Sequence, residues 1–198
     1  MGVIAACLLS YCVGSIPSGL ILGKVVWGVD LREHGSHNIG ATNAWRTLGK
    51  VPGFTIFFLD LLKGVLGVWF GMHFSDVSLA PILGGIFAIV GHSWSILLRF
   101  KGGKGVATGL GVIAMLMPKA TVVVFLVWLL LVLATRYVSL GSIVAAACVP
   151  LLAWFFSYET PYIVFGAVTA AFVIYRHKSN IGRLLNGTEN KIKAGHRR

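Results

Sequence analysis

Acidic side chains are scarce in this sequence. Its 198 residues contain six Asp and Glu against seventeen Lys and Arg, which gives a formal net charge of +11. Among the predicted loops, only Asp30 and Glu33 bring two carboxylates close together. Phosphotransferases that use activated nucleotides need a carboxylate cluster to bind Mg²⁺, and none is visible. The sequence therefore predicts chemistry that requires neither a metal nor another cofactor.

Cysteine is also rare. Cys7, Cys12 and Cys148 are odd in number and lie within apolar stretches, which favours buried thiols over disulfides. The histidines lack the carboxylate support and ordered spacing of a zinc site, and the familiar H-x-x-x-x-D motif of glycerolipid acyltransferases is absent. Neither residue type predicts a metal centre.

Apolar residues dominate what is present. They make up 57% of the chain, charged residues only 12%, and the mean hydropathy is +0.85. This composition predicts an all-α, polytopic integral membrane protein. A helix needs about 20 apolar residues to cross a bilayer core about 30 Å thick, and stretches at roughly 3–23, 52–72 and 80–98 meet this requirement.

Four shorter apolar runs follow. Residues 106–117 and 120–135 meet at Pro118, which favours a break between two helices, and they form either two short spans or a re-entrant hairpin. The runs at 138–157 and 161–175 are separated by a polar turn. The sequence thus predicts about seven transmembrane helices, or five and a hairpin.

The basic residues predict the orientation in the membrane. Residues 106–135 return the chain to the same side of the membrane whether they form two spans or a re-entrant hairpin. One face therefore carries the segments 30–51, 99–105, 136–141 and 176–198. That face carries fourteen of the seventeen Lys and Arg. The positive-inside rule makes it cytoplasmic, with the N-terminus outside and the C-terminal tail inside. Basic residues confined to short loops indicate membrane topology rather than a nucleic-acid partner.

The N-terminus has no Lys or Arg before Lys24. A cleaved signal peptide begins with a positive region, so we expect the first span to be retained. No internal repeat or soluble domain is visible, and we expect a single membrane-embedded domain over residues 1–198.

A glycine-rich basic segment, RFKGGKGVAT at 99–108, lies between two apolar runs. It reads either as an anion cradle built from backbone N–H groups, Lys101 and Lys104, or as a loop that only marks topology. It is not a Walker A motif, because Gly105 follows Lys104 where Ser or Thr is required. It could still hold a phosphate through its amides, Lys104 and the helix that starts near Val106.

Three further polar groups lie on the predicted cytoplasmic face. The segment GSHNIGATNAWR at 35–46 is dense in hydrogen-bonding side chains, which either cap helices and form turns or surround a polar ligand. Ser139 and Ser142 lie at a membrane boundary, where a helix cap explains either one. In the segment RHKSNIGRLLNGTENK at 176–191, His177 and Asn180 share a helix face, so the amide could orient an imidazole that acts as general base.

Asp60 and Lys63 lie within the predicted span 52–72, three residues apart. Charges inside a bilayer are costly, so we expect the two to pair with each other or with another span. The pair is either structural or a relay, and a relay keeps open a second hypothesis, a small transporter for an organic phosphate.

Four segments in order, GSHNIGATNAWRTLG, DLLKG, GHSWSILLRFKGGKGVATGLG and RHKSNIGRLLNGTENK, closely resemble the bacterial membrane family of acyl-phosphate:glycerol-3-phosphate acyltransferases. The resemblance spans nearly the whole chain. It implies a compact seven-span fold in the bacterial cytoplasmic (inner) membrane, with the active site on the cytoplasmic face. It also implies transfer of an acyl group from acyl phosphate to glycerol 3-phosphate, which gives 1-acyl-glycerol 3-phosphate (lysophosphatidate) in phospholipid biosynthesis.

The resemblance assigns roles residue by residue. The residues that match catalytic positions or essential polar groups of the site are Ser36, Arg46, Ser142, His177 and Asn180. Those that match the substrate and phosphate site are Thr42, Asn43, Arg46, Gly102, Gly103, Lys104 and Gly105. Glu189 matches a residue with a structural role. His37 and Ile39 depart from the family's commoner glycine and proline.

The expected chemistry is simple because an acyl phosphate carries a good leaving group. Arg46, Lys104 and the loop amides would neutralise phosphate charge, with the acyl chain among membrane lipid. His177, oriented by Asn180, would accept the proton of the attacking hydroxyl, unless a phosphate of the substrate is the base instead.

Overall fold

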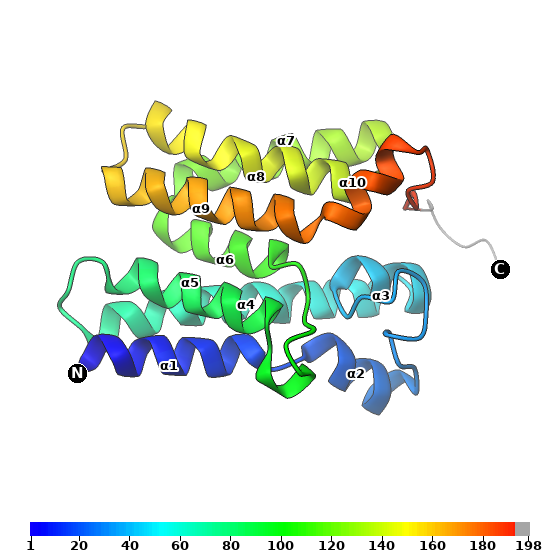
Figure 1. Ribbon diagram of the computed structural model, residues 1–198, viewed down its shortest axis with the longest axis horizontal. Coiled ribbons are helices and arrows are strands. Elements are labelled where there is room, and N and C mark those ends of the chain that lie inside the picture. Colours follow the sequence, from blue (N-terminus) through cyan, green and yellow to red (C-terminus); the bar gives the residue numbers. More distant parts are fainter. Residues whose placement is uncertain (193–198) are drawn as a thin grey trace. The chain divides into compact units, whose positions relative to one another are not determined.

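The computed structural model describes residues 1–192, which form ten α-helices and one 3₁₀ helix and contain no strand (Figure 1). The all-α prediction is confirmed for these residues. Contacts divide the chain into two compact units, Met1–Leu116 and Met117–Arg198, and each is described by itself. Three basic residues of the predicted cytoplasmic tail, Lys193, Arg197 and Arg198, lie outside the described residues.

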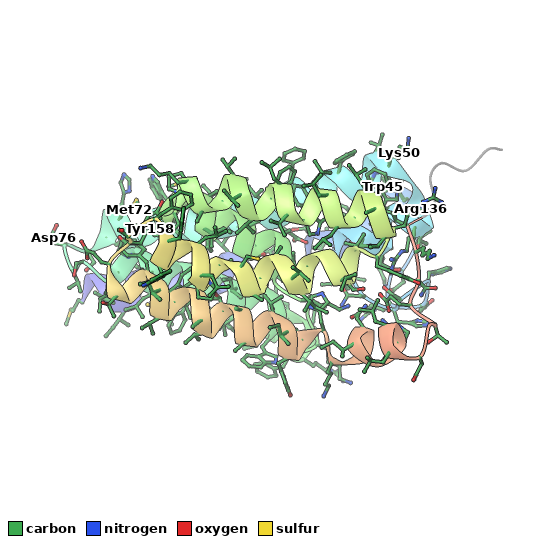
Figure 2. The ribbon with its side chains drawn as sticks, turned by 90° about the horizontal axis from the view of Figure 1, so that it is seen from above. Trp45, Lys50, Met72, Asp76, Arg136 and Tyr158 are labelled. Carbon is green, nitrogen blue, oxygen red and sulfur yellow. The ribbon has the colours of Figure 1, made fainter. Side chains whose placement is uncertain are left out.

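The first unit contains six α-helices and the 3₁₀ helix. In chain order they are α1 (Gly2–Ser15), α2 (Ser18–Trp27), α3 (Ala41–Leu48), α4 (Lys50–Phe74), α5 (Ala80–Ser93), η1 (Ile96–Leu98) and α6 (Val106–Leu116). The long helix α4 is its centre, because α1, α3, α5 and α6 all pack against it. Lys50 lies near one end of α4, and Met72 and Asp76 lie near the other (Figure 2).

Glycines let the helices of this unit approach one another closely. A side chain at Gly64 on α4 would collide with the carbonyl of Thr108 on α6, and one at Gly111 on α6 would collide with the carbonyl of Leu61. Between helices in lipid there is little hydrophobic driving force, so close backbone packing through small residues supplies the attraction. The glycines of α4, with Asp60 and Lys63, therefore face protein.

The apolar stretch expected as a span at 3–23 corresponds to Gly2–Trp27, which is long and apolar enough for one crossing. Its helix is interrupted between Ser15 and Ser18, because Pro17 has no N–H to continue the ladder of α1. One expectation for this unit needs correction. The segment expected as a loop at 30–51 contains the two-turn helix α3. Helix α3 was missed because its apolar residues cover only one face, of which Ala44 is buried.

The second unit contains α7 (Pro118–Thr135), α8 (Val138–Phe155), α9 (Thr160–Arg176) and α10 (Lys178–Leu185). The predicted break at Pro118 is confirmed: α6 ends at Leu116, and Pro118 opens α7, where its missing N–H costs nothing. Helix α8 packs against both α7 and α9. Arg136 and Tyr158 mark the two ends of α8 (Figure 2).

Length and apolar composition allow five stretches of the described chain to cross a membrane. They are Gly2–Trp27, Lys50–Phe74, Ala80–Leu98, Pro118–Thr135 and Val138–Phe155. Two apolar helices are shorter, α6 with 11 residues and α9 with 17. A count of seven crossings remains a prediction.

Candidate functional site

The loop between α2 and α3 folds around the side chain of Asn43. The Asn43 amide, which is 1% exposed, donates from Nδ2 to the carbonyls of Leu31 and His34 at 3.0 Å and of Asn38 at 2.8 Å. Its Oδ1 accepts the backbone N–H of Ser36 at 2.8 Å. The polar segment is thus bent as expected, but it is bent around its own asparagine. In the described contacts the Asn43 amide serves the loop and not a ligand.

This geometry makes a prediction for Asn43. We expect Asn43→Ala to open the loop to proteases, because it removes the side-chain partner of the Ser36 N–H and of the Leu31 and Asn38 carbonyls, at about 1–3 kcal/mol for each group that stays buried. Asn43→Asp should do the same, because it keeps the acceptor for Ser36 and loses the donors. Limited proteolysis of purified protein measures the effect. The control is Asn186→Ala at an exposed asparagine, and cleavage no faster than in that control would contradict the prediction.

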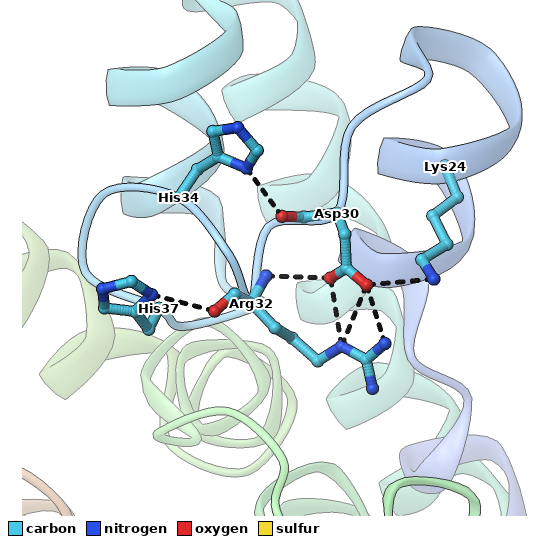
Figure 3. A network of polar contacts seen from close by, with 5 residues as sticks. All are labelled: Lys24, Asp30, Arg32, His34 and His37. Carbon is cyan, nitrogen blue, oxygen red and sulfur yellow. Dashed lines mark hydrogen bonds and ion pairs between the residues drawn. The ribbon is translucent and has the colours of Figure 1, made fainter.

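Charged residues fix the start of the same loop (Figure 3). The Asp30 carboxylate accepts hydrogen bonds from Arg32 Nη2 at 2.7 Å and Arg32 Nε at 3.0 Å, and pairs with Lys24 Nζ at 2.9 Å. The Arg32 guanidinium is the main reason that the pKa of Asp30 lies well below its ordinary value. Lys24, in the last turn of α2, is part of this network.

His37 adopts a backbone conformation that explains its unusual place in the motif. Its φ is 56°, in the left-handed region where glycine, the family's commoner residue here, meets no strain. The Nδ1 atom of His37 lies 2.9 Å from the carbonyl of Arg32, and Nδ1 of His34 lies 3.0 Å from the carbonyl of Asp30 (Figure 3). These contacts give both rings a part in holding the loop.

Three other predicted site residues of this region are half-buried: Ser36, Thr42 and Arg46. Thr42 and Arg46 are four residues apart on α3 and therefore share a face. None of the three caps α3, whose N-cap is Gly40 without a side-chain hydrogen bond. The helix-cap interpretation of the Ser and Thr residues is therefore wrong for this helix.

The glycine-rich segment is a tight return that runs back along the end of α5. The N–H groups of Gly102 and Gly103 donate to the carbonyls of Ser93 and His92, both at 3.1 Å. Gly105 has a φ of 79°, and α6 begins at the next residue. The amides of Gly102 and Gly103 therefore hold the loop in shape, and the expected anion cradle stays a prediction.

The two lysines of this segment differ in their surroundings. Lys104 is half-buried, whereas Lys101 is exposed. Lys104 also stands beside the first turn of α6, whose leading N–H groups lack partners within the helix and favour an anion. The arrangement leaves Lys104 and the amides that follow it as the groups suited to a phosphate.

In the second unit, Glu189 is the centre of a buried hydrogen-bond network. Its Oε1 accepts from Ser139 Oγ at 2.8 Å and from Asn180 Nδ2 at 2.7 Å, and its Oε2 accepts from Arg183 Nε at 2.7 Å. Burial raises the pKa of Glu189, but the three hydrogen bonds together outweigh it, so the pKa lies below the ordinary value. Glu189 therefore holds α8, α10 and the segment after α10 together.

The His177 ring is buried at the junction of α9 and α10. Its Nδ1 lies 2.8 Å from the carbonyl oxygen of Val173. A carbonyl only accepts, so Nδ1 carries the hydrogen and Nε2 of the neutral ring holds the lone pair. The Val173 carbonyl thus fixes the tautomer of His177, whereas the Asn180 amide donates to Glu189, and orientation of the ring by Asn180 stays a prediction.

The two serines of α8 are buried and do not cap the helix. Ser142 Oγ donates to the carbonyl of Val138 at 2.9 Å, one turn earlier, and Ser139 donates to Glu189. The N-cap of α8 is Tyr137, with no side-chain hydrogen bond. The cap interpretation of Ser139 and Ser142 is therefore wrong.

We expect Glu189→Gln to lower the thermal midpoint at neutral pH by several degrees. Glutamine keeps one oxygen acceptor but puts an NH₂ group where the other oxygen accepts, so at least one donor of the network meets another donor. It also removes the charge that pairs with Arg183, a loss of about 1–3 kcal/mol. A lowered pKa stabilises the fold above the ordinary glutamate value of about 4.3, and the stabilisation is lost as the pH falls through the folded value.

Thermal unfolding of wild type and variant at pH 7 and at lower pH measures both effects. The difference in midpoint should be full at pH 7 and should shrink as the pH falls. Glu159→Gln at an exposed position is the matched control and should leave the midpoint unchanged. A difference between wild type and Glu189→Gln that grew on acidification would contradict this assignment.

Comparison with known proteins identifies the family. The profile described as glycerol-3-phosphate acyltransferase matches residues 4–187. This chain belongs to the glycerol-3-phosphate acyltransferase family. The glycerol-3-phosphate acyltransferase of Desulforamulus reducens is 45% identical over 92% of both chains. Glycerol-3-phosphate acyltransferase 2 of Moorella thermoacetica is 48% identical over 94% of this chain and 96% of its own.

Solved structures of another family member are also similar. The crystal structure of PlsY (YgiH), an integral membrane glycerol 3-phosphate acyltransferase, in its glycerol 3-phosphate form has a TM-score of 0.91 and 40% identity over 98% of this chain and 96% of that one. The structure of its lysophosphatidic acid form has a TM-score of 0.89 and 39% identity, and it covers the same 98% and 96% of the two chains. This member of the glycerol-3-phosphate acyltransferase family is accordingly an integral membrane protein.

Proposed function

We propose that this acyltransferase transfers an acyl group from an acyl phosphate to the sn-1 hydroxyl of glycerol 3-phosphate. The products are lysophosphatidate and inorganic phosphate. The observation that carries the proposal is the likeness, at 40% and 39% identity, to a relative solved in a glycerol 3-phosphate form and a lysophosphatidic acid form. Glycerol 3-phosphate is the acceptor that the proposed reaction would use, and lysophosphatidic acid is its acylated product.

The donor is proposed from the chemistry of the side chains. In an acyl phosphate the carbonyl carbon is bonded to the oxygen of a good leaving group, so transfer needs positioning and neutralisation of charge rather than a protein nucleophile. Lys104 and the amides that follow it, with Arg46 on α3, are the groups proposed to hold the phosphates. The sn-1 oxygen forms a bond to the carbonyl carbon, and the bond from that carbon to the phosphate oxygen breaks.

His177 is the proposed general base. With Nδ1–H donating to the Val173 carbonyl, Nε2 is the atom that accepts the proton of the attacking hydroxyl. Asn180 and Glu189 support the turn that carries His177, through their hydrogen bond of 2.7 Å. The phosphate that leaves an acyl phosphate dianion takes up one proton to become HPO₄²⁻, so the proton that His177 accepts from the hydroxyl passes on to the released phosphate and the reaction balances.

The remaining site residues are proposed to orient the substrates. Ser36, Thr42 and Ser142 supply hydroxyl groups for the glycerol or the acyl carbonyl. Asn43, Gly102 and Gly103 act by shaping the two loops whose hydrogen bonds they make. These are proposals from the residue types and their local geometry.

The membrane placement is part of the same proposal. We propose one membrane-embedded domain with seven crossings in the bacterial cytoplasmic membrane, Met1 outside, and the site residues on the cytoplasmic face. The support is the positive-inside pattern, fourteen of the seventeen Lys and Arg on that face. This placement matches water-soluble glycerol 3-phosphate on one side and an acyl chain that lies in lipid.

The experiment is an assay of purified protein with acyl phosphate and labelled glycerol 3-phosphate. We expect a labelled lipid-soluble product with acyl phosphate, and none when the donor is omitted. Folded protein that gives no product would refute the proposal. Accumulation of labelled glycerol 3-phosphate in proteoliposomes without donor would instead indicate a transporter.

A further inference from the structure

A buried cluster of three titratable side chains lies in the first unit, apart from the residues that the proposed reaction uses. Lys63 Nζ lies 2.6 Å from Asp60 Oδ1, and Nδ1 of His92 lies 3.7 Å from the same oxygen. Lys63 is 5% exposed, Asp60 is 3% exposed and His92 is 6% exposed. Asp60 and Lys63 come from α4, and His92 comes from the last turn of α5.

His92 joins this cluster to the glycine-rich segment. A Cβ atom at Gly103 would collide with Nε2 of the His92 ring, and one at Gly102 would collide with the His92 carbonyl oxygen. The Gly103 N–H donates to the same carbonyl at 3.1 Å. The ring therefore has Asp60 on its Nδ1 side and the backbone of Gly103 on its Nε2 side.

Helix α4 also contacts the C-terminal end of the glycine-rich segment. Gly64, next to Lys63, is where α4 meets the carbonyl of Thr108 in the first turns of α6. The residues from Gly102 to Thr108 are thus flanked by His92 before Lys104 and by the Gly64 contact after it. Lys104 lies between these two points of support.

Stability alone does not account for two charges in this position. A buried ion pair is weak evidence for stability, because apolar residues of similar volume often serve as well or better. Charges within membrane helices are costly and are found mostly at functional positions. The cluster therefore calls for a function that apolar residues cannot supply, namely holding the orientation of the His92 ring by charge.

We propose that Asp60, Lys63 and His92 are positioning residues that hold the glycine-rich segment, and through it Lys104, in the shape that binds phosphate. Lys63 fixes the Asp60 carboxylate at 2.6 Å, the carboxylate orients the His92 ring by its charge at 3.7 Å, and the ring supports the backbone at Gly103. The inference deepens the proposed function, since it rests on the segment being a phosphate site. It gives α4 a role in substrate affinity.

The first test is the double variant Asp60→Leu with Lys63→Met. It removes both charges together, so no unpaired charge is left in the helix packing. We expect the folded variant to show a Michaelis constant raised roughly tenfold to a hundredfold for one of the two phosphate-bearing substrates, as for supporting partners of metal ligands. The other Michaelis constant should change far less. Loss of folded protein would lower the apparent kcat without moving either constant.

The second test covers the case in which the double variant does not fold. His92→Ala should raise the same Michaelis constant. His92→Gln, whose amide reaches the Nε2 side of the ring, should lie closer to wild type. The matched control is His73→Ala, at an exposed histidine near the far end of α4, which should change neither constant. Wild-type Michaelis constants in His92→Ala or in the folded double variant would overturn the inference.

Equilibrium binding of labelled inorganic phosphate separates this inference from the proposed function. If the wild type makes no lysophosphatidate, the proposed reaction fails, but the binding measurement still decides the role of the cluster. Weaker binding of phosphate to the variants than to wild type would support positioning. Equal binding, or no binding to any of them, would overturn it.

Discussion

Replacement of His177 by Gln lowers kcat by about 10²- to 10⁴-fold, the usual contribution of a general base. Glutamine keeps a polar side chain of similar size in the buried position at the end of α9. It removes the nitrogen lone pair that accepts the proton. The Michaelis constants for both substrates should change little, because the ring is not one of the proposed phosphate-binding groups. Steady-state kinetics of the purified variant measures both parameters.

The variant distinguishes two hypotheses: either His177 is the general base, or a phosphate of the substrate is. A near-normal kcat in His177→Gln would assign the proton to the substrate and contradict the role proposed here. The pH profile is a second readout: the limb of kcat that reports the base in wild type should be absent in the variant. His73→Gln, at an exposed histidine near the far end of α4, controls for the loss of a histidine as such.

Replacement of Lys104 by Ala reduces kcat/KM roughly ten- to a hundredfold, the loss expected for a charge-assisted hydrogen bond to phosphate. Lys104 is half-buried beside the first turn of α6, so its ammonium group is only partly screened by water. Most of the loss should be in the Michaelis constant of the substrate whose phosphate it binds. Kinetics against each substrate in turn shows which one that is.

The chain offers a matched control three residues earlier. Lys101 has the same charge in the same segment but is exposed, so Lys101→Ala should leave kcat/KM within about twofold, as for a screened surface charge. If both variants lost activity equally, the segment would act only through its total charge. Normal activity in Lys104→Ala would return the segment to a purely topogenic role.

Apolar length and proline placement were sufficient to predict most of the helices. The break at Pro118 follows from the chemistry of proline alone, and α6 and α7 end and begin where it requires. Helix α3 could not be predicted in the same way, because two polar turns with one apolar face look like a loop to a hydropathy criterion. The interruption between α1 and α2 was also not predicted, because apolar residues continue on both sides of Pro17 and hydropathy alone shows one uninterrupted stretch.

The site was predictable by residue type but not by partner. The family motifs pointed to Asn43 and Asn180 as polar groups of the site, yet their hydrogen bonds to the loop carbonyls and to Glu189 depend on tertiary contacts. Ser139 and Glu189 are 50 residues apart in sequence and bond at 2.8 Å. No local pattern encodes such a pair. The contact of the His92 ring with Gly103 could not be predicted for the same reason.

The central claim is that the acyl group, and not the phosphoryl group, is transferred from the acyl phosphate. An acyl phosphate with ¹⁸O in the oxygen that bridges carbon and phosphorus tests it directly, because the two reactions break different bonds to that oxygen. Attack at the carbonyl carbon predicts that all of the label appears in inorganic phosphate and none in lysophosphatidate. Label in released fatty acid, with a second phosphate on glycerol, would contradict the account.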